Sequence, residues 1–366
     1  MIAQDLFKII SDLISFKTVF PNEKEFFNCI TYIKNHFKNT NLHVEEFEFN
    51  NSNSLVISNS KTKQFDLIFC GHIDVVPASE DLFTVKKDGD LLYGRGVCDM
   101  KGQVAVMMQI IRELSQENSK LKVALFLTSD EERGGFDGVK KLLNELDYSS
   151  NVAIVPDGGF NYSLVSEAKG VLQIKVSTVG TESHASEPWN GINAISKLLE
   201  IFKQIVSEFP NPKNHLDWKT SFNIAKIEGG DSINKVPNKA TMHIDIRHTC
   251  ADTSENIINY IQNIDNSVNI EILAQGEAFK LDENNIYVKK YINTCQPLIN
   301  KNVDIIKCHS ASDGRFFSKK NIPCLIMNPI GGNLHGDNEW VSLESLNTLK
   351  NVYKNYLQEL PIKNIK

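Results

Sequence analysis

Carboxylate and imidazole side chains follow several apolar segments of this sequence at the point where each segment ends. The segments read IFCGHID, FLTSDEERGG, AIVPDGG and CLIMNPIGGNLH, and their polar members are His72, Asp74, Asp130, Glu131, Glu132, Asp157 and His335. The carboxyl ends of parallel strands meet at one edge of a sheet, so we expect these side chains to converge. Like charges placed together repel one another unless a cation gathers them. The pattern therefore predicts a pair of divalent metal ions.

A further carboxylate, Asp99 in YGRGVCDMKGQ, completes the ligand set of a dinuclear site. Mixed imidazole and carboxylate ligands suit Zn²⁺, with Co²⁺ or Mn²⁺ as substitutes. Asp99 also precedes an apolar-periodic segment, so a helix N-cap is its ordinary structural interpretation.

The other candidates have ordinary interpretations as well. A single histidine is more often a core or surface residue than a ligand. The paired glutamates of SDEERGG could favour a helix N-terminus through its dipole. Asp157 is compatible with a turn, and His335 with Asp337 and Glu339 could form a solvated loop. These interpretations leave the joint occurrence of the residues at strand ends unexplained.

The elements that must position these residues alternate between β-rich and helical patterns. This alternation predicts an α/β domain with a mixed, mostly parallel sheet. The expected strands are 66–71, 122–128, 152–155 and 323–327, and the expected helices are 101–115 and 135–146.

A different rhythm occupies residues 169–274. The order of patterns there is strand, helix, strand, strand, helix, strand, which is the split ferredoxin-like order. We therefore expect one domain from residues 1–168 and 275–366, with an α+β domain of residues 169–274 inserted into it.

Size and composition limit the possible partners. The chain has 366 residues, 41% of them hydrophobic, and a formal net charge of -6, which allows one large or two medium domains. Charges of both signs are dispersed, so no basic stripe indicates nucleic acid or an anionic membrane. No apolar run approaches the ~20 residues that a membrane span needs. The seven cysteines lack a CxxC pair, and with an N-terminus unlike a signal peptide they predict a cytoplasmic protein that acts on a small molecule.

Together the motifs resemble the M20 metallopeptidase family, which includes acetylornithine deacetylases, succinyl-diaminopimelate desuccinylases, aminoacylases and carboxypeptidases. The similarity covers nearly the whole chain, and the segments that carry it, in family order, are GHIDVVP, YGRGVCDMKG, SDEERGG, PDGG, GTESHASEPWNGINAI, NKVPNKATMHIDIRH, SASDGRF and GGNLHGDNEWV.

The resemblance implies a role for each residue of the predicted metal site. One metal would be held by His72 and Asp157 and the other by Glu132 and His335, with Asp99 bridging them next to a cis peptide bond. Glu131 would be the general base and acid. Asp74 would be the carboxylate that orients His72.

The resemblance also implies roles outside the metal ligands. His184 would stabilise the oxyanion, often from the partner subunit of a homodimer, and the inserted domain would serve as a lid and dimerisation domain. The implied substrate-binding residues are Asn234, Arg247 and Arg315. Structural alternatives remain, because Asn234 could shape a turn and Arg247 could form an ion pair, whereas Arg315 suits capture of a carboxylate.

These expectations describe a hydrolase of N-acyl amino acids that uses two divalent ions, zinc first among them. SDGRF favours a succinyl-diaminopimelate desuccinylase, whereas Glu167-Ala168-Lys169-Gly170 is closer to deacetylase and carboxypeptidase relatives. A dipeptidase or carboxypeptidase of the same family is the first alternative. A metal-dependent binding protein without catalysis is the alternative from another class.

Overall fold

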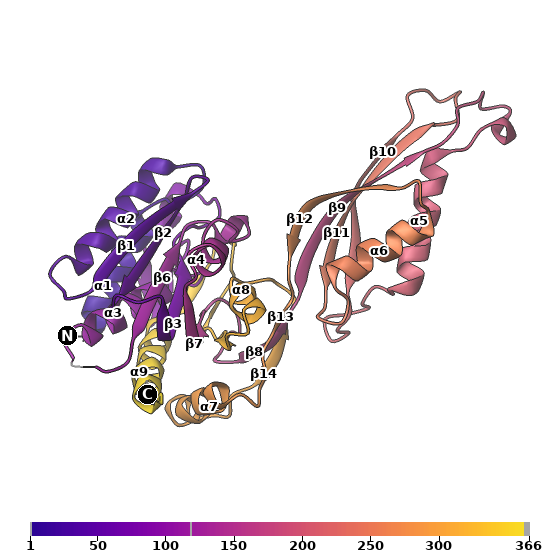
Figure 1. Ribbon diagram of the computed structural model, residues 1–366. Helices are drawn as coiled ribbons and strands as arrows, with labels where there is room; N and C mark the ends of the chain where they lie inside the picture. The colour runs from indigo at the N-terminus through magenta and orange to yellow at the C-terminus, as the bar shows by residue number, and fades with distance from the viewer. Residues whose placement is uncertain (1, 118, 362–366) are drawn as a thin grey trace. The chain divides into compact units, whose positions relative to one another are not determined.

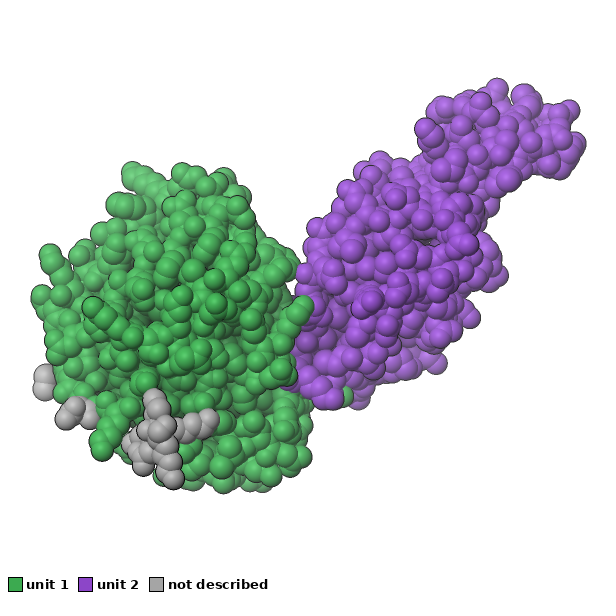
Figure 2. Space-filling model, viewed as in Figure 1, with its two compact units in different colours: residues 1–166, 281–307, 312–366 green, residues 167–280, 308–311 purple. Residues whose placement is uncertain are grey.

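The computed structural model describes residues 2–117 and 119–361, which divide into two compact units (Figures 1 and 2). Unit 1 comprises residues 1–166, 281–307 and 312–366, and unit 2 comprises residues 167–280 and 308–311. Nearly all of unit 2 is thus a single insertion, residues 167–280, in the sequence of unit 1.

A six-stranded sheet forms the centre of unit 1. Its strands, in spatial order, are β1 (His43–Phe49), β2 (Ser52–Ser58), β6 (Val123–Thr128), β3 (Gln64–His72), β7 (Ser149–Ile154) and β15 (Cys324–Leu325). The pairs β6–β3, β3–β7 and β7–β15 are parallel, and β1 and β2 join antiparallel. The predicted mixed, mostly parallel sheet is confirmed. The last expected strand, 323–327, is shorter than predicted, because the Ile326 carbonyl accepts from the Val165 N–H at 3.0 Å.

Helix α3 (Lys101–Leu114) packs against β3 and β6, and also against α1 (Ile2–Ser15) and α9 (Leu343–Glu359). Nearly every residue of α3 is buried. Its second residue must be small, because a Cβ on Gly102 would lie 2.3 Å from the Val97 carbonyl oxygen. This close approach starts the helix directly behind the segment that carries Asp99.

The other helices of unit 1 are α2 (Glu23–Phe37), α4 (Val139–Asn144), α7 (Ile286–Ile299) and α8 (Gly314–Lys319). Helix α4 is shorter than the predicted 135–146. Its start is delayed because the Asp130 carboxylate accepts from the N–H groups of Asp137 and Gly138, at 2.8 and 3.0 Å, and holds this segment as a turn.

Two small sheets lie outside the central sheet. One contains β16 (Gly331–Gly332), β17 (Trp340–Ser342), β5 (Leu91–Tyr93) and β4 (Lys86–Asp88) in that order. The other contains β13 (Phe279–Lys280), β8 (Leu164–Ala168) and β14 (Ile305–Cys308).

Unit 2 is built on a four-stranded antiparallel sheet with two helices. In chain order its elements are β9 (Gly170–Val179), α5 (Ala194–Glu208), β10 (Ser221–Gly229), β11 (Lys239–His248), α6 (Ser254–Ile264) and β12 (Asn269–Gly276). The spatial order β10-β11-β9-β12 is ferredoxin-like. Alternate residues of β9 and β11 are buried against apolar residues of α5 and α6, so one face of the sheet carries the core of this unit.

All seven cysteines are free thiols. Five of them are buried, Cys29, Cys70, Cys98, Cys295 and Cys324, and two are partly exposed, Cys250 and Cys308. Among the described residues, no helix combines the length and the apolar character needed to cross a membrane.

Candidate metal centre

Three adjacent parallel strands deliver polar residues to the same edge of the central sheet. His72 is the last residue of β3, Asp157 follows the end of β7, and the turn after β6 carries Asp130 and the short 3-10 helix Glu131–Arg133. The apolar strands thus end where the predicted ligands begin, as expected for an open parallel sheet.

The side chains form two groups that share one carboxylate. In the first group, the ligand atoms of His72, Asp99 and Asp157 all lie within 4.8 Å of one another, and in the second the same holds for Asp99, Glu132 and His335. One oxygen of Asp99 lies 3.1 Å from Nε2 of His72, and the other lies 3.3 Å from Nε2 of His335. This is the arrangement that a carboxylate bridging two cations requires.

Asp74 links His72 to the turn after β6. Its backbone carbonyl lies 3.0 Å from Nδ1 of His72 and accepts the proton of that nitrogen. A neutral His72 ring would therefore keep its proton on Nδ1 and have Nε2, which lies 3.1 Å from Asp99, free to bind a cation. The Asp74 carboxylate lies 3.4 Å from the same Nδ1 and accepts from the N–H groups of Glu131 and Glu132, at 3.3 and 3.0 Å. One residue therefore holds two predicted site segments together.

The pKa values of the carboxyl groups in the candidate centre are shifted in opposite directions. Burial, followed by repulsion from Asp99, raises the pKa of Asp157 to about 6, and burial raises the pKa of Glu132 to about 7. Burial opposes ionisation of Asp99 as well, but its hydrogen bonds with His335 and His72 outweigh burial and hold its pKa below the ordinary value.

The electrostatics and the donor set both fit divalent cations. Buried carboxylates that repel one another are relieved by bound positive charge. Imidazole nitrogens combined with carboxylate oxygens are the donors that zinc and neighbouring transition metals accept. The residues present therefore fit two such ions.

Glu131 stands apart from both ligand groups. Burial, followed by repulsion from Asp157, raises the pKa of Glu131 well above its ordinary value. A carboxyl group of this kind, close to candidate metal ligands but outside both groups, is suited to carry a proton.

Arg315 is placed in unit 1 at the start of α8 and is almost completely buried. Its guanidinium donates to the carbonyls of Ser312 and Gly134, at 3.3 and 2.6 Å, and lies 4.6 Å from the centre of the Phe316 ring. The structure thus shows it joining α8 to the turn after Glu131–Arg133. Its role in substrate binding stays a prediction.

The other accessory residues belong to unit 2. His184 is exposed, and its Nδ1 accepts from the Ser186 N–H at 3.2 Å, so the neutral ring carries its proton on Nε2. The Ala185 N–H donates to the Asn234 carbonyl at 2.9 Å, which places the His184 and Asn234 loops side by side. Arg247 pairs with Asp245 at 2.8 Å, as its structural interpretation expected.

Two residues that the motif analysis did not select are buried beside the ligands. Arg95 precedes Asp99 by four residues, Glu339 follows His335 by four residues, and their side chains form an ion pair with Nη1 and Oε2 2.6 Å apart. The solvated-loop interpretation of Glu339 is wrong, because its side chain is only 1% exposed. The sequence signal that could have identified this pair is a charged residue four positions from each of two predicted ligands, Asp99 and His335.

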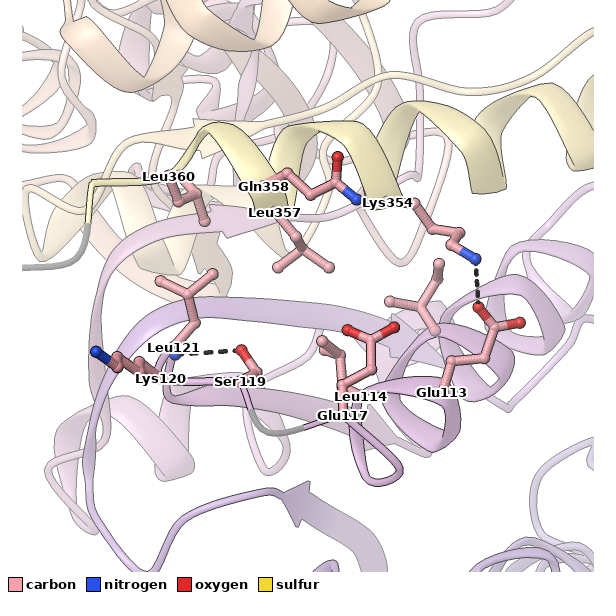
Figure 3. Close-up of a pocket in the computed structure, with 11 residues that line it drawn as sticks. Glu113, Leu114, Glu117, Ser119, Lys120, Leu121, Lys354, Leu357, Gln358 and Leu360 are labelled. Carbon is pink, nitrogen blue, oxygen red and sulfur yellow. Dashed lines mark hydrogen bonds and ion pairs between the residues drawn. The ribbon is translucent and has the colours of Figure 1, made fainter.

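The metal-ligand candidates do not line the hollow between the C-terminal ends of α3 and α9 (Figure 3). That hollow, about 210 Å³ in volume, is lined by apolar residues such as Leu114, Leu121 and Leu357 and by polar residues that include the Glu113–Lys354 ion pair. This hollow and the candidate metal centre are thus in different places.

The sequence matches Peptidase family M20/M25/M40 over residues 68–359. A succinyl-diaminopimelate desuccinylase of Legionella pneumophila (strain Paris) is 25% identical over 386 residues, covering 98% of this chain and 99% of that relative.

Solved structures share the fold across the whole chain. A tripeptidase from Staphylococcus aureus subsp. aureus Mu50 superposes with a TM-score of 0.77 at 23% identity, and the match covers 98% of each chain. A Bacillus subtilis protein named as a dinuclear metal binding peptidase from the M20 family gives a TM-score of 0.72 at 14% identity, with 99% of each chain covered. The predicted fold class, an α/β domain with an inserted ferredoxin-like domain, is confirmed.

Proposed function

The chain belongs to Peptidase family M20/M25/M40, and from this premise we propose that it hydrolyses the amide bond of an N-acyl amino acid. Membership makes it a metal-dependent amidohydrolase or peptidase that acts on small-molecule amides. The observation that carries the proposal is the pair of ligand groups that share Asp99, with the unshared carboxyl of Glu131 close to them.

We assign the ligands as the two groups divide them. His72 and Asp157 would hold one ion, Glu132 and His335 the other, and Asp99 both. Zinc is the proposed metal, with cobalt or manganese as substitutes, because the donors are imidazole and carboxylate. When bound, a pair of such ions polarises the scissile carbonyl and acidifies water.

The proton transfers are assigned to Glu131. It takes the proton from the attacking water and delivers it to the nitrogen of the leaving amine, a role typically worth about 10²- to 10⁴-fold in rate. Asp74 supports the reaction by fixing the tautomer of His72 and the backbone of Glu131 at the same time.

The substrate-facing roles are assigned to residues of both units. His184, with its ring proton on Nε2, would donate to the developing oxyanion, a contribution of about 3 kcal/mol for one donor. Asn234 in the adjacent loop, Arg247 and Arg315 are the proposed substrate-binding residues, each beside the structural contacts described above.

The specific substrate proposal is an N-succinyl amino acid, as in succinyl-diaminopimelate desuccinylases. It is supported by the name of the Legionella relative and by the SDGRF segment. Hydrolysis of short peptides is the second candidate, and the tripeptidase with the same fold favours it. A metal-dependent binding protein without catalysis is the third candidate. The Glu131 carboxyl group argues against it, because a binding protein does not need a group that transfers protons.

The inserted domain is proposed to close over the substrate and to form a homodimer. Its boundaries as expected from sequence are 169–274, with 1–168 and 275–366 forming the catalytic domain. Unit 2 exposes several large apolar side chains, including Trp189, Leu216 and Ile233, which supports a self-association surface. Light scattering after size exclusion would measure the mass. A fully active monomer would contradict the dimer.

A cytoplasmic location is proposed from the free cysteines.

The test is a substrate panel read by release of free amine. Protein loaded with Zn²⁺ or Co²⁺ is assayed on N-succinyl amino acids, N-acetyl amino acids and di- and tripeptides, and metal content is measured on the same sample. Turnover of the acylated amino acids supports the proposal, activity on peptides alone selects the second candidate, and binding without turnover selects the third.

The mechanistic variant is Glu131→Gln, which keeps the size of the side chain and removes its basic oxygen. We expect a fall in kcat of about 10²- to 10⁴-fold with unchanged metal content. The matched control is Glu117→Gln, an exposed glutamate on unit 1, which should keep wild-type activity. A loss of only a few-fold in Glu131→Gln would contradict the mechanism.

A further inference from the structure

A buried carboxylate, that of Glu339, gathers the N–H groups of the segment that carries Asp99. Its Oε2 accepts from Arg95 Nη1 at 2.6 Å and from the Gly96 N–H at 2.9 Å. Its Oε1 accepts from the N–H groups of Cys98 and Asp99, at 2.9 and 3.0 Å. The position of the Asp99 backbone is therefore set by a side chain 240 residues away in the sequence.

Arg95 connects the same carboxylate to the other candidate ligand segment. While Nη1 donates to Glu339, Nη2 donates to the backbone carbonyl of His335 at 2.9 Å. His335 has a φ of 62°, a left-handed conformation that residues other than glycine seldom adopt without support from their surroundings. The fork of the guanidinium thus holds His335 in place relative to the Asp99 segment.

Strand pairing brings these two charged residues together. Strands β5 and β17 pair antiparallel with Tyr93 opposite Trp340, and the Gly94 N–H extends the pairing to the Glu339 carbonyl at 3.2 Å. Arg95 therefore follows β5 at the point where Glu339 precedes β17. The ion pair closes the end of a small sheet whose loops carry one candidate ligand each.

We propose that the Arg95–Glu339 pair is a positioning device that fixes the distance between Asp99 and His335 and so preorganises the second ligand group. The inference rests on the metal site of the proposed function. An ion pair that only stabilised the fold would have no need to bond to the N–H of one ligand residue and to the C=O of another. These two bonds make the pair a support for the ligands themselves.

The proposal predicts an effect on one ion rather than on both. His72 ends β3, a strand with a neighbour on each side, and its Nε2 lies 3.1 Å from the Asp99 carboxylate, so the central sheet also supports the first ligand group. His335 lies in the loop between β16 and β17, and its side chain is 53% exposed. Weakening the Arg95–Glu339 pair should therefore release the ion that His335 would help to bind and leave the other ion in place.

The decisive variant is Arg95→Lys, which keeps the positive charge but cannot donate to Glu339 and His335 in the same fork. Metal-free protein is titrated with Co²⁺, and the two binding events are followed by calorimetry and by the visible absorption of bound cobalt. We expect wild type to bind two ions. We expect Arg95→Lys to lose about 10- to 100-fold in affinity for one ion, with the other changed by less than a factor of three.

Two further variants guard the interpretation. Glu339→Gln removes one negatively charged acceptor and should reproduce the selective loss, and if it does not fold, Arg95→Lys alone decides. Glu113→Gln breaks a partly exposed ion pair that contacts no candidate ligand, with Lys350 and Lys354 at 2.6 and 2.9 Å, and should leave both affinities unchanged. Thermal unfolding of every variant is measured alongside.

Unchanged affinities in Arg95→Lys, or an equal loss for both ions, would overturn the inference. Wild-type protein that binds two ions and hydrolyses substrate, with Arg95→Lys binding them equally well, would overturn the inference and leave the proposed function standing. Wild-type protein that binds neither ion would overturn both.

Discussion

The two halves of the candidate metal centre share Asp99 but are positioned by different means. His72 ends a strand with a parallel neighbour on each side, and its side chain is 1% exposed. His335 lies in a loop, in a left-handed conformation, with its side chain 53% exposed. The first half depends on the central sheet, whereas the second depends on a few polar contacts around Arg95 and Glu339. Two ligand groups of one candidate metal centre can thus be positioned by a sheet in one case and by a loop in the other.

The largest effect on metal binding is expected at Asp99, the residue that both halves share. Asp99→Ala removes a ligand from both halves, so both affinities should fall by more than the about 10- to 100-fold that loss of a supporting residue costs. Activity should then be undetectable at micromolar metal. Equilibrium dialysis with Zn²⁺ measures both sites, and retention of either ion at wild-type affinity would show that Asp99 does not bridge them.

The next effect separates the halves. His72→Ala leaves Asp74 and Asp99 buried without their imidazole partner, so we expect a loss of one ion together with about 1–3 kcal/mol of the free energy of unfolding. His335→Ala removes a half-exposed ring that lies 3.3 Å from Asp99 and from Glu132, so we expect loss of the other ion with a smaller cost, about 0.2–1 kcal/mol, to the free energy of unfolding of the metal-free protein. Urea denaturation of metal-free protein measures this difference. Equal destabilisation by the two variants would show that the halves are positioned alike.

The smallest effect concerns an ion pair that supports no ligand, that of Glu113. Burial raises the pKa of Glu113, but Lys350 and Lys354 outweigh burial and lower it below the ordinary value. The folded state therefore favours the ionised form. This stabilisation is complete above the unfolded pKa of about 4.3 and is lost as the pH falls through the lower folded pKa.

For a partly exposed pair, Glu113→Gln should cost about 0.2–1 kcal/mol of the free energy of unfolding at pH 7. That cost should disappear at pH values below the folded pKa of Glu113, as measured by thermal unfolding of both proteins across a pH series. A cost that stays constant down to pH 3 would mean that the contribution of Glu113 is not its charge.

The sheet-borne half of the centre could be predicted from sequence because its information is local. Strands β3, β6 and β7 each contain an apolar run, at residues 67–70, 123–127 and 152–154, and each run is followed within a few residues by His72, by Glu131 and Glu132, or by Asp157. The order of helices and strands in unit 2 was readable for the same reason, since the spacing of its buried residues follows each element.

The loop-borne half could be predicted only in part. His335 was found through its motif, but the partners of Arg95 lie 240 and more residues away, so nothing near Arg95 in the sequence indicates them. The start of α4 was missed because it depends on where the carboxylate of Asp130 finds its donors. Arg315 was predicted to capture a carboxylate, and its two carbonyl partners could not be predicted because one of them, Gly134, is far away in the sequence.

The distribution of thiols offers a practical handle for biophysics. Burial raises the pKa of the thiols of Cys29, Cys70, Cys98, Cys295 and Cys324, which keeps them unreactive towards maleimides. Cys250 and Cys308 are partly exposed, and both belong to unit 2. A thiol-directed dye should therefore label unit 2 of the wild-type protein alone. An acceptor introduced on unit 1 would then give a fluorescence ruler for movements between the units during turnover.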